Sequence, residues 1–555
     1  MAVAPAARSS FSASSAGRLS KSRIWKCSSR VSSRGDPAIW TGSSPGITSS
    51  GRSVVDILVS PYSVSCCLVG QLTSPTGQFS TRAGAGASHT SRSCDRLGRV
   101  TPVVEDLLMA IGETGKGVDG SYEAVTTASR AAFDRAAAVM PGGPKGAYFY
   151  SPYPLFFERG DGCRLTDIDG RTFLDCANHH TAQVLGHNHP AVIEAINSQV
   201  SRGVVLGGPT GVETELAEEL CDRVASLERV RFCNSGTEAT LHAIRLARGI
   251  TGRSRIAKFE GGYHGSHDAV EISVAPPLEN AGDPAAPTPV AGVRGIAPGA
   301  TGEVLVLPYD DVDAVTRLVE THADELACIL LDPKAGILEP VEGLAETVSA
   351  LAGEHDILLI ADEVVAFRLA RGGWQQTRGI TPDLTTYGKL VGGGFPIGAF
   401  GGRAEVMDRL DMRGGSTGFH QSGTFSAHPV AMAAGVATLR QMTPEAFGAL
   451  DSLGRRLDDG LSEIAGRHEL ALSWVVAGSL FSLYFADHAP RSYRDLAACR
   501  KEWNSLLFHQ LVEKGYYLSH SLGMNALSLA MEPEDVDGLV AAIDESLEAM
   551  VADAG

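Results

Sequence analysis

The apolar positions of the chain indicate strands in two different settings. Residues 155–177 form short segments separated by Gly-containing turns, a pattern typical of an antiparallel meander. Residues 327–331 and 357–360 are uninterrupted apolar runs, as expected for strands that are covered on both faces. Helical spacing is present over residues 121–140 and 190–200. The chain therefore combines a small antiparallel element with the strands of a buried sheet.

In the middle of the chain, predicted strands alternate with predicted helices. A strand at 230–233 leads through a turn into a helix that contains Leu241, and the next strand follows at 256–259. Repeated βαβ units of this kind predict an α/β fold with a large, mostly parallel sheet. Residues 275–302 are rich in Pro, Gly and Ala and predict a long loop. After about residue 445 the pattern changes to helix, strand, helix, strand, helix, which predicts a C-terminal α+β domain.

Charge separates the first hundred residues from the rest of the chain. The 555 residues carry 47 Lys and Arg against 64 Asp and Glu, a formal net charge of −17. Residues 1–104 hold 12 basic and 3 acidic residues together with 24 Ser, which leaves 35 basic and 61 acidic residues in the remainder. A body this acidic is a poor candidate for sequence-independent binding to nucleic acid or to an anionic membrane. We therefore expect no nucleic-acid partner and no membrane.

Residues 1–108 are a basic, Ser- and Arg-rich extension that we expect to be disordered. Their acid-poor composition is typical of an organelle transit segment, but a disordered tail without targeting function has the same composition. Because the composition changes abruptly at Met109, the extension can equally be translated upstream sequence ahead of a start at Met109. The apolar run 54–72 contains Asp56 and Pro61, so it is a poor transmembrane helix. We expect a cytoplasmic protein, or an organellar one if the extension is a genuine transit segment.

Cysteine usage gives no sign of a metal or of a disulfide framework. Of the 10 cysteines, the six that follow residue 104 are scattered without CxxC spacing. The cysteines therefore predict neither a zinc site nor a disulfide framework, and no metal ligand is assigned. A reducing compartment fits this cysteine usage.

Three polar motifs follow predicted strands. The first, Asn234-Ser235-Gly236-Thr237-Glu238, precedes a helix, where free N–H groups and the helix dipole favour an anion such as phosphate. Taken alone, the motif is also explained by ordinary helix capping, in which the Ser and Thr hydroxyls bond the first helical N–H groups. The second places Lys389 among glycines, where a lysine beside a cofactor can form a Schiff base and then move a proton. The alternative is a solvent-exposed loop lysine with no role in a site.

The third motif is Asp362-Glu363-Val364, which ends an apolar strand. A carboxylate at the carboxyl end of a strand points into the usual ligand crevice of an α/β sheet. A magnesium site and a simple helix cap are the alternatives for this pair of acids.

In order and spacing, these motifs resemble those of the class III, fold-type I pyridoxal-phosphate aminotransferases. That family includes glutamate-1-semialdehyde aminomutase and the β-amino-acid transaminases. The resemblance extends from about Pro141 to Met550 and includes further motifs at 259–265, 389–402 and 422–425. It implies a large, mostly parallel-sheet domain and a smaller α+β domain built from N- and C-terminal segments.

The implied domain boundaries follow from this resemblance. Residues 206–440 would form the large domain that binds pyridoxal phosphate. The small domain would combine an N-terminal segment, 109–205, with a C-terminal one, 441–555.

The resemblance also implies how pyridoxal 5'-phosphate would be bound. Lys389 would carry it as a Schiff base, and Asp362 would pair with the pyridine nitrogen and keep it protonated. Tyr263 would stack on one face of the ring and Val364 would pack on the other. The phosphate would be held by Ser235, Gly236 and Thr237, and by Thr424 of the neighbouring subunit in a homodimer.

The substrate-binding residues depart from the family pattern. Lys145 follows a Pro-Gly-Gly turn where the family usually has an Arg that clamps a substrate carboxylate, and a lysine lacks the bidentate fork of arginine. Arg413 is the nearest match to a second arginine of the β-amino-acid branch, with a surface arginine as the alternative. Asp332-Pro333-Lys334 stands where the family usually has Glu-Pro. The long 275–302 loop resembles the mobile lid of the aminomutase more than the shorter β-transaminase loop.

The function implied by the resemblance is transfer of an amino group from an α- or β-amino acid to a keto acceptor. The alternative is intramolecular transfer of the glutamate-1-semialdehyde 2,1-aminomutase type. A non-catalytic protein that retains the fold is a third class, which the presence of both Lys389 and Asp362 disfavours. The expected partners are a small-molecule amino donor, a keto acceptor and a second subunit.

Overall fold

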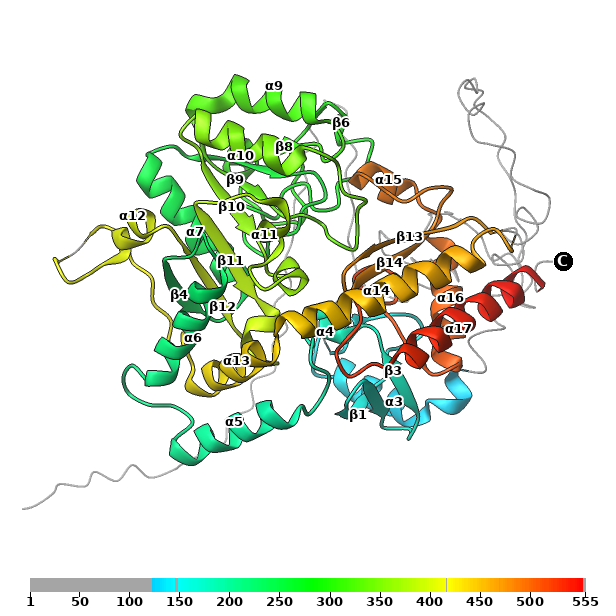
Figure 1. Ribbon diagram of the computed structural model, residues 1–555. Coiled ribbons are helices and arrows are strands. Elements are labelled where there is room, and N and C mark those ends of the chain that lie inside the picture. The colour runs from blue at the N-terminus through cyan, green and yellow to red at the C-terminus, as the bar shows by residue number, and fades with distance from the viewer. Residues whose placement is uncertain (1–121, 145–147, 416, 469, 553–555) are drawn as a thin grey trace, which may run out of the picture. The chain divides into compact units, whose positions relative to one another are not determined.

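The computed structural model describes residues 122–144, 148–415, 417–468 and 470–552 (Figure 1). They belong to one compact unit, Asp95–Gly555. The predictions for residues 1–108, and the position of Lys145, lie outside the described residues.

A seven-stranded sheet has the order β4-β12-β11-β10-β9-β5-β8. Its strands are β4 (Arg229–Cys233), β12 (Gly398–Gly402), β11 (Leu384–Gly388), β10 (Leu358–Asp362), β9 (Leu326–Leu331), β5 (Arg255–Phe259) and β8 (Val304–Leu307). Neighbouring strands are parallel except at β12, which is antiparallel to both β11 and β4. The predicted α/β fold with a mostly parallel sheet is confirmed.

Helices cover both faces of this sheet. The covering helices include α7 (Gly236–Thr251), α9 (Val312–His322) and α10 (Leu344–Glu354). On β9, Ile329 and Leu331 pack in the core that contains α9 and α10, whereas Cys328 and Leu330 pack in the core that contains α7. Successive residues of a strand point to opposite faces, so α7 covers one face and α9 and α10 cover the other (Figure 1). This double coverage explains the uninterrupted apolar runs.

Two smaller sheets bring the two ends of the described chain together. One contains β1 (Phe157–Asp161), β2 (Arg164–Asp167), β3 (Thr172–Asp175) and β15 (Tyr516–Tyr517); the other contains β13 (Leu472–Ala477), β14 (Leu480–Phe485) and β16 (Asn525–Ala526). Strands β1 to β3 form the predicted antiparallel meander, and β15 pairs with β3 in parallel. One apolar core accordingly joins residues 122–177 with residues 453–550. These contacts support the predicted small domain, whose boundaries remain a prediction.

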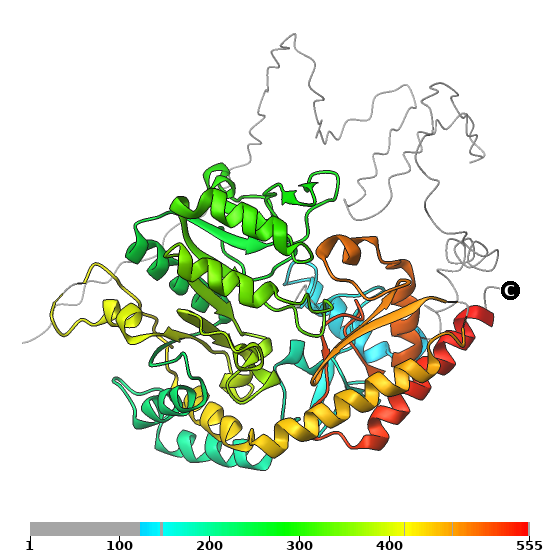
Figure 2. The same cartoon turned by 45° about the horizontal axis from the view of Figure 1, so that its top comes forward.

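The remaining elements complete the fold. The longer helices are α3 (Thr127–Ala137), α5 (Pro190–Arg202), α6 (Gly211–Arg223), α13 (Pro429–Gln441), α14 (Pro444–Ile464), α16 (Glu502–Glu513) and α17 (Pro533–Ala552). The shorter ones are α4 (Asn178–Thr181), α8 (Pro298–Gly302), α11 (Trp374–Arg378), α12 (Ala404–Met407), α15 (Tyr493–Ala498), η2 (Ala323–Glu325), η3 (Ala366–Leu369), η4 (Lys389–Gly392) and η5 (Asp408–Leu410). The amphipathic helices α14 and α17 pack side by side (Figure 2). None of the described helices combines the length and the apolar character that a membrane span requires.

The predicted 275–302 loop is only partly irregular. It contains a two-residue hairpin, β6 (Gly282–Asp283) with β7 (Ala286–Pro287), and α8 near its end. Such short elements have no apolar periodicity, so the sequence pattern did not show them.

A buried arginine connects segments that are distant in the sequence. Arg368 in η3 is 1% exposed. Its guanidinium donates to Oγ of Ser479 at 3.0 Å and to the carbonyl oxygens of Thr181 at 2.7 Å and Leu527 at 2.6 Å. Burial lowers its pKa to about 9. The guanidinium thus joins three segments, since it bonds backbone carbonyls in two of them and a hydroxyl in the third.

Replacing Arg368 with Met is expected to lower the free energy of unfolding by about 2 kcal/mol or more, because two buried carbonyls lose a donor. Denaturant-induced unfolding of the full chain measures this loss. Arg371 on the same segment is a matched control: it is exposed and pairs with Asp222 at 2.6 Å, so Arg371→Met is expected to change stability by less than about 1 kcal/mol. Equal effects of the two substitutions would contradict the anchoring role.

Candidate active site

Five polar segments meet at one edge of the seven-stranded sheet. They follow the ends of β4, β5, β9, β10 and β11. These strands run in the same direction, so their carboxyl ends lie at the same edge, where α/β sheets bind ligands. A pocket of about 640 Å³ lies between the segments. Of the residues that the sequence analysis assigned to the cofactor, the pocket is lined by Ser235, Gly236, Thr237, Tyr263, Asp362, Val364 and Lys389.

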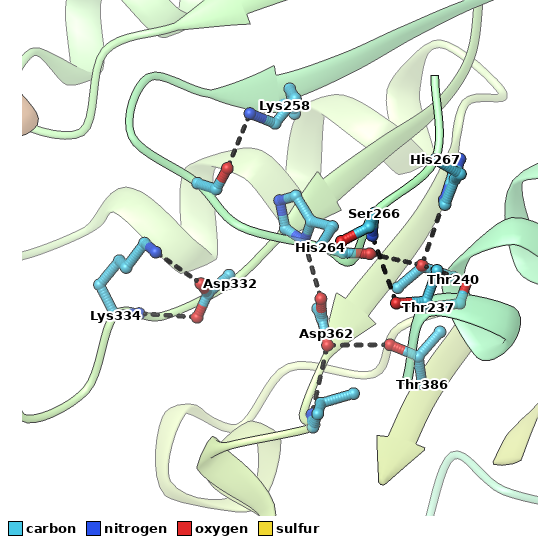
Figure 3. A network of polar contacts seen from close by, with 12 residues as sticks. Thr237, Thr240, Lys258, His264, Ser266, His267, Asp332, Lys334, Asp362 and Thr386 are labelled. Atoms are coloured by element: carbon cyan, nitrogen blue, oxygen red, sulfur yellow. Dashed lines mark hydrogen bonds and ion pairs between the residues drawn. The ribbon is translucent and has the colours of Figure 1, made fainter. Parts of the chain in front are cut away.

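Asp362 ends β10 and is 6% exposed. Its Oδ2 lies 2.7 Å from Nδ1 of His264, and its Oδ1 accepts from Oγ1 of Thr386 at 3.0 Å and from the Val364 amide at 3.2 Å (Figure 3). Burial by itself raises the pKa of this carboxyl, but these hydrogen bonds outweigh it and lower the pKa below its ordinary value. Asp362 is therefore held as an anion at the pocket.

Lys389 follows β11 and has a φ of 49°, in the left-handed region that side chains other than glycine rarely occupy. Burial lowers the pKa of its amine, while the charges of Asp362 and Asp332 oppose this effect. A lowered pKa increases the fraction of neutral amine, which is the form that attacks a carbonyl or accepts a proton. The strained backbone and the perturbed amine both mark a functional position.

The beginning of α7 forms a cradle for an anion. Ser235 caps the helix, its Oγ accepting from the Glu238 amide at 3.1 Å, and the first turn leaves N–H groups without helical acceptors. A Cβ at Gly236 would lie 2.9 Å from Cγ2 of Val364, so the close approach of the two segments requires glycine. The capping role and the anion-binding role are compatible, since they use different groups.

Tyr263 and the loop that carries it depend on a buried lysine. Lys258 of β5 is fully buried, and its Nζ donates to the carbonyl oxygens of Gly262 at 2.8 Å and Ile272 at 2.6 Å. Figure 3 draws one of these two hydrogen bonds. Burial lowers its pKa to about 7. Lys258 therefore holds both ends of the segment that places Tyr263 and His264 at the pocket. Tyr263 itself is 52% exposed in the single chain.

Two residues assigned by the sequence analysis lie apart from the pocket in the described chain. Thr424 is exposed in a turn and is not among the described residues that line the pocket. The Arg413 side chain is 90% exposed and pairs with Asp411, whose two carboxylate oxygens it contacts at 2.5–2.9 Å. The contacts of one chain thus give neither residue a role at its own pocket.

The structure adds pocket residues that the sequence analysis did not assign. His179 and His180 line the pocket from a segment, 178–181, in which four consecutive residues have φ between 49° and 71°. A left-handed turn of this kind costs roughly 1–2 kcal/mol per residue, and such strain is typical of functional sites. Asn234, Lys334 and Met524 also line the pocket. Lys334 was visible in the sequence only as a departure from the family pattern.

Glu363 is next to Asp362 in the sequence, but its side chain lies in the core and not at the pocket. It is fully buried, and its carboxylate accepts from the Trp374 amide at 2.8 Å and from the amide and side chain of Gln375 at 3.0 and 2.9 Å. Burial raises its pKa to about 7, although these donors oppose the rise. The paired acids read from the sequence therefore separate into a pocket carboxylate and a core carboxylate. Among the described residues, no group of three or more potential ligands is placed to hold a metal ion.

The raised pKa of Glu363 predicts a pH-dependent contribution to stability. The folded state binds this proton more tightly than the unfolded state does, so the contribution is fully present below about pH 4.5 and is lost as the pH rises through about 7. Relative to Glu363→Gln, the wild-type free energy of unfolding is expected to fall by a few kcal/mol between these limits. Denaturant unfolding of both proteins at several pH values measures this. A difference that does not depend on pH would contradict the assignment.

The chemistry of the pocket fits pyridoxal phosphate. The beginning of α7 and its hydroxyls suit a phosphate, and Asp362, kept ionised, suits a protonated ring nitrogen. Val364 and Tyr263 offer an apolar and an aromatic surface for the ring, and Lys389 supplies an amine.

Comparison with known proteins identifies the family. Residues 147–543 match the class-III aminotransferase family. The glutamate-1-semialdehyde 2,1-aminomutase of Methanothermobacter thermautotrophicus is 39% identical over 426 residues, which cover 75% of this chain and 98% of that protein. An omega-transaminase structure from Sphaerobacter thermophilus has 38% identity and a TM-score of 0.74, covering 76% of this chain and 98% of the other. A transaminase structure with PLP bound has 33% identity and a TM-score of 0.71, covering 77% and 99%.

The family match extends over both the seven-stranded sheet and the smaller sheets, and it includes every segment that lines the pocket. The two solved structures each cover about three quarters of this chain, at 38% and 33% identity. The chain therefore belongs to the class-III aminotransferases and has their fold-type I architecture.

Proposed function

We propose that this enzyme transfers an amino group from an α- or β-amino acid to a keto acceptor, with pyridoxal 5'-phosphate bound at the pocket. Lys389, Asp362 and the beginning of α7 line one pocket of about 640 Å³, and the proposal rests on this arrangement. When bound, the cofactor supplies an electron-withdrawing ring that stabilises negative charge on the substrate carbon.

Each residue of the pocket has a role in this proposal. Asp362 holds a proton on the ring nitrogen, since it is kept anionic by its hydrogen bonds. Lys389 would hold the cofactor through its amine, and the same amine would move the proton at the substrate carbon. Because its pKa is lowered, a larger fraction of this amine is in the neutral form that accepts a proton. Phosphate binding is assigned to Ser235, Gly236 and Thr237, and the two ring faces to Tyr263 and Val364.

The remaining assignments require a second subunit. We propose a homodimer with shared active sites in which Thr424 reaches the phosphate in the partner's pocket and Arg413 acts at the substrate. Tyr263 and Phe425 are 52% and 57% exposed in the single chain, which supports a partner subunit that covers these side chains. Lys145 stays assigned to the substrate carboxylate by the family pattern. The proposed location is the cytoplasm.

Intramolecular transfer of the glutamate-1-semialdehyde type is the second candidate, supported by the name of the relative from Methanothermobacter thermautotrophicus. One assay separates the two candidates. An aminomutase converts glutamate-1-semialdehyde with no added keto acid, whereas a transaminase needs a second substrate. A panel of α- and β-amino donors against pyruvate and 2-oxoglutarate then identifies the donor class. Absence of amino transfer in every combination would contradict both candidates.

A further inference from the structure

Lys334 places a second ammonium group at the pocket. It follows β9, and among the described residues that line the pocket, Lys334 and Lys389 are the only Lys or Arg side chains. The Lys334 side chain is 10% exposed. Its charge lowers the pKa of Lys389, so the two amines act on each other across the pocket. Since Lys389 is assigned to the cofactor, Lys334 is the lysine left for another anion.

The backbone holds Lys334 in a fixed and unusual conformation. Its φ is 49°, in the left-handed region. Its amide donates to Oδ1 of Asp332 at 3.0 Å, and its carbonyl accepts from the amides of Ile337 and Leu338, both at 2.9 Å. A Cβ at the nearby Gly336 would lie 2.5 Å from Cβ of Leu480, so β14 packs directly on this turn. Such a strained position persists only where the surroundings enforce it, and it is typical of ligand sites.

Asp332 pairs with Lys334 without using all of its donors. Nζ of Lys334 lies 3.2 Å from Oδ2 of Asp332 (Figure 3). An ammonium group has three N–H donors, so one ion pair leaves donors for a ligand. The negative charge of Asp332 weakens the attraction of Lys334 for an anion. The pair has no net charge, so Lys334 attracts an anion through its remaining N–H donors, and less strongly than a lone ammonium group does.

We propose that Lys334 binds the carboxylate of the amino donor and makes the enzyme selective for donors that carry one. This inference rests on the proposed function, and it adds Lys334 to Lys145 and Arg413 as a residue that acts on the substrate. An ammonium group recognises a carboxylate as a point charge, without the bidentate geometry of arginine. Lys334 therefore selects a donor because it carries a carboxylate, and depends less on how that carboxylate is oriented. Both α- and β-amino acids meet this requirement.

The test measures binding of two unreactive ligands to the full-length holoenzyme by calorimetry. 3-Phenylpropanoate carries the carboxylate, and 3-phenylpropanamide is its neutral counterpart. The wild type is expected to bind the carboxylate about ten-fold more tightly, the size of one charge-assisted hydrogen bond. Lys334→Met is expected to remove this preference, and Lys334→Arg, which keeps the charge, to retain it. Lys514→Met is the matched control, because Lys514 pairs with Glu545 at 3.0 Å on another part of the chain.

Asp332→Asn separates a ligand-binding role from a structural ion pair. If Lys334 binds the ligand, removing the competing carboxylate strengthens binding of 3-phenylpropanoate, opposite to the effect of Lys334→Met. If the pair only supports the turn, both substitutions weaken binding of the two ligands alike, and the proposal is overturned. A wild type without preference for the carboxylate, or a preference that persists in Lys334→Met, overturns it as well.

Failure of this inference differs from failure of the proposed function. Borohydride reduction of the holoenzyme is expected to attach the cofactor to Lys389, and this readout does not depend on a substrate carboxylate. If Lys389 is labelled but Lys334→Met leaves the carboxylate preference intact, the inference alone fails. If Lys389 is not labelled, the proposed function fails.

Discussion

Lys389→Ala is expected to abolish amino-group transfer, with a loss of about 10⁴-fold or more in kcat. The substitution removes the covalent attachment point and the group that moves the proton, and positioned proton transfer alone contributes about 10²–10⁴-fold. No other side chain that the structure describes at the pocket supplies an amine except Lys334, which is held by Asp332. Steady-state kinetics with the best donor measure the loss.

Two further measurements make the Lys389 prediction specific. The borohydride-reducible cofactor adduct of the wild type is expected to disappear in Lys389→Ala, and added small primary amines are expected to restore part of the proton transfer. The control is Lys514→Ala, which removes an exposed lysine elsewhere and is expected to keep both the adduct and the activity. A reducible adduct at another lysine of Lys389→Ala would contradict the assignment.

Asp362→Asn is expected to lower kcat by about 10²–10³-fold, the range observed when a single electrostatic contact to a reacting group is removed. Asparagine fills the same space and can still accept from Thr386 and Val364, but it has no negative charge to keep a ring nitrogen protonated. Because hydrogen bonds already lower the pKa of Asp362, the wild type is expected to lose no activity through this group until the pH falls below about 4.

Glu363→Gln provides the matched control for Asp362→Asn. The two acids are adjacent in the sequence, but Glu363 is bonded to Trp374 and Gln375 in the core. Glu363→Gln is therefore expected to change stability with pH and to leave kcat near the wild-type value. If both substitutions lower kcat equally, the loss comes from disturbance of β10, and the electrostatic role of Asp362 is wrong.

The sequence predicted the sheet because its strands have a strong local signal. Runs such as 327–331 are apolar throughout, and only strands buried on both faces tolerate this. The site was predictable for a related reason. Each motif follows a strand, and in a parallel sheet the ends of such strands meet at one edge, so Ser235, Asp362 and Lys389 converge although they are far apart in the sequence.

Other residues could not be assigned from local sequence. Arg368 and Lys258 are charged and carry no apolar periodicity, so the chain gives no sign that both are buried and bonded to backbone carbonyls. The left-handed turn at 178–181 contains no glycine, the residue that usually indicates such a backbone conformation in a sequence. Thr424 and Arg413 are a different case, because their proposed roles involve a second subunit and the contacts of one chain do not decide them.

By itself, the sequence determined the family, the α/β class and the identity of the groups at the carboxyl edge of the sheet. These follow from periodicity and from motifs that each lie within a few residues. Only the tertiary structure decided which of two adjacent acids faces the pocket and which lies in the core, and that Lys334 joins the pocket beside Asp332. The physical reason is that the charge state, burial and bonding partners of a side chain depend on all the segments that surround it, whereas a sequence motif contains only its own few residues.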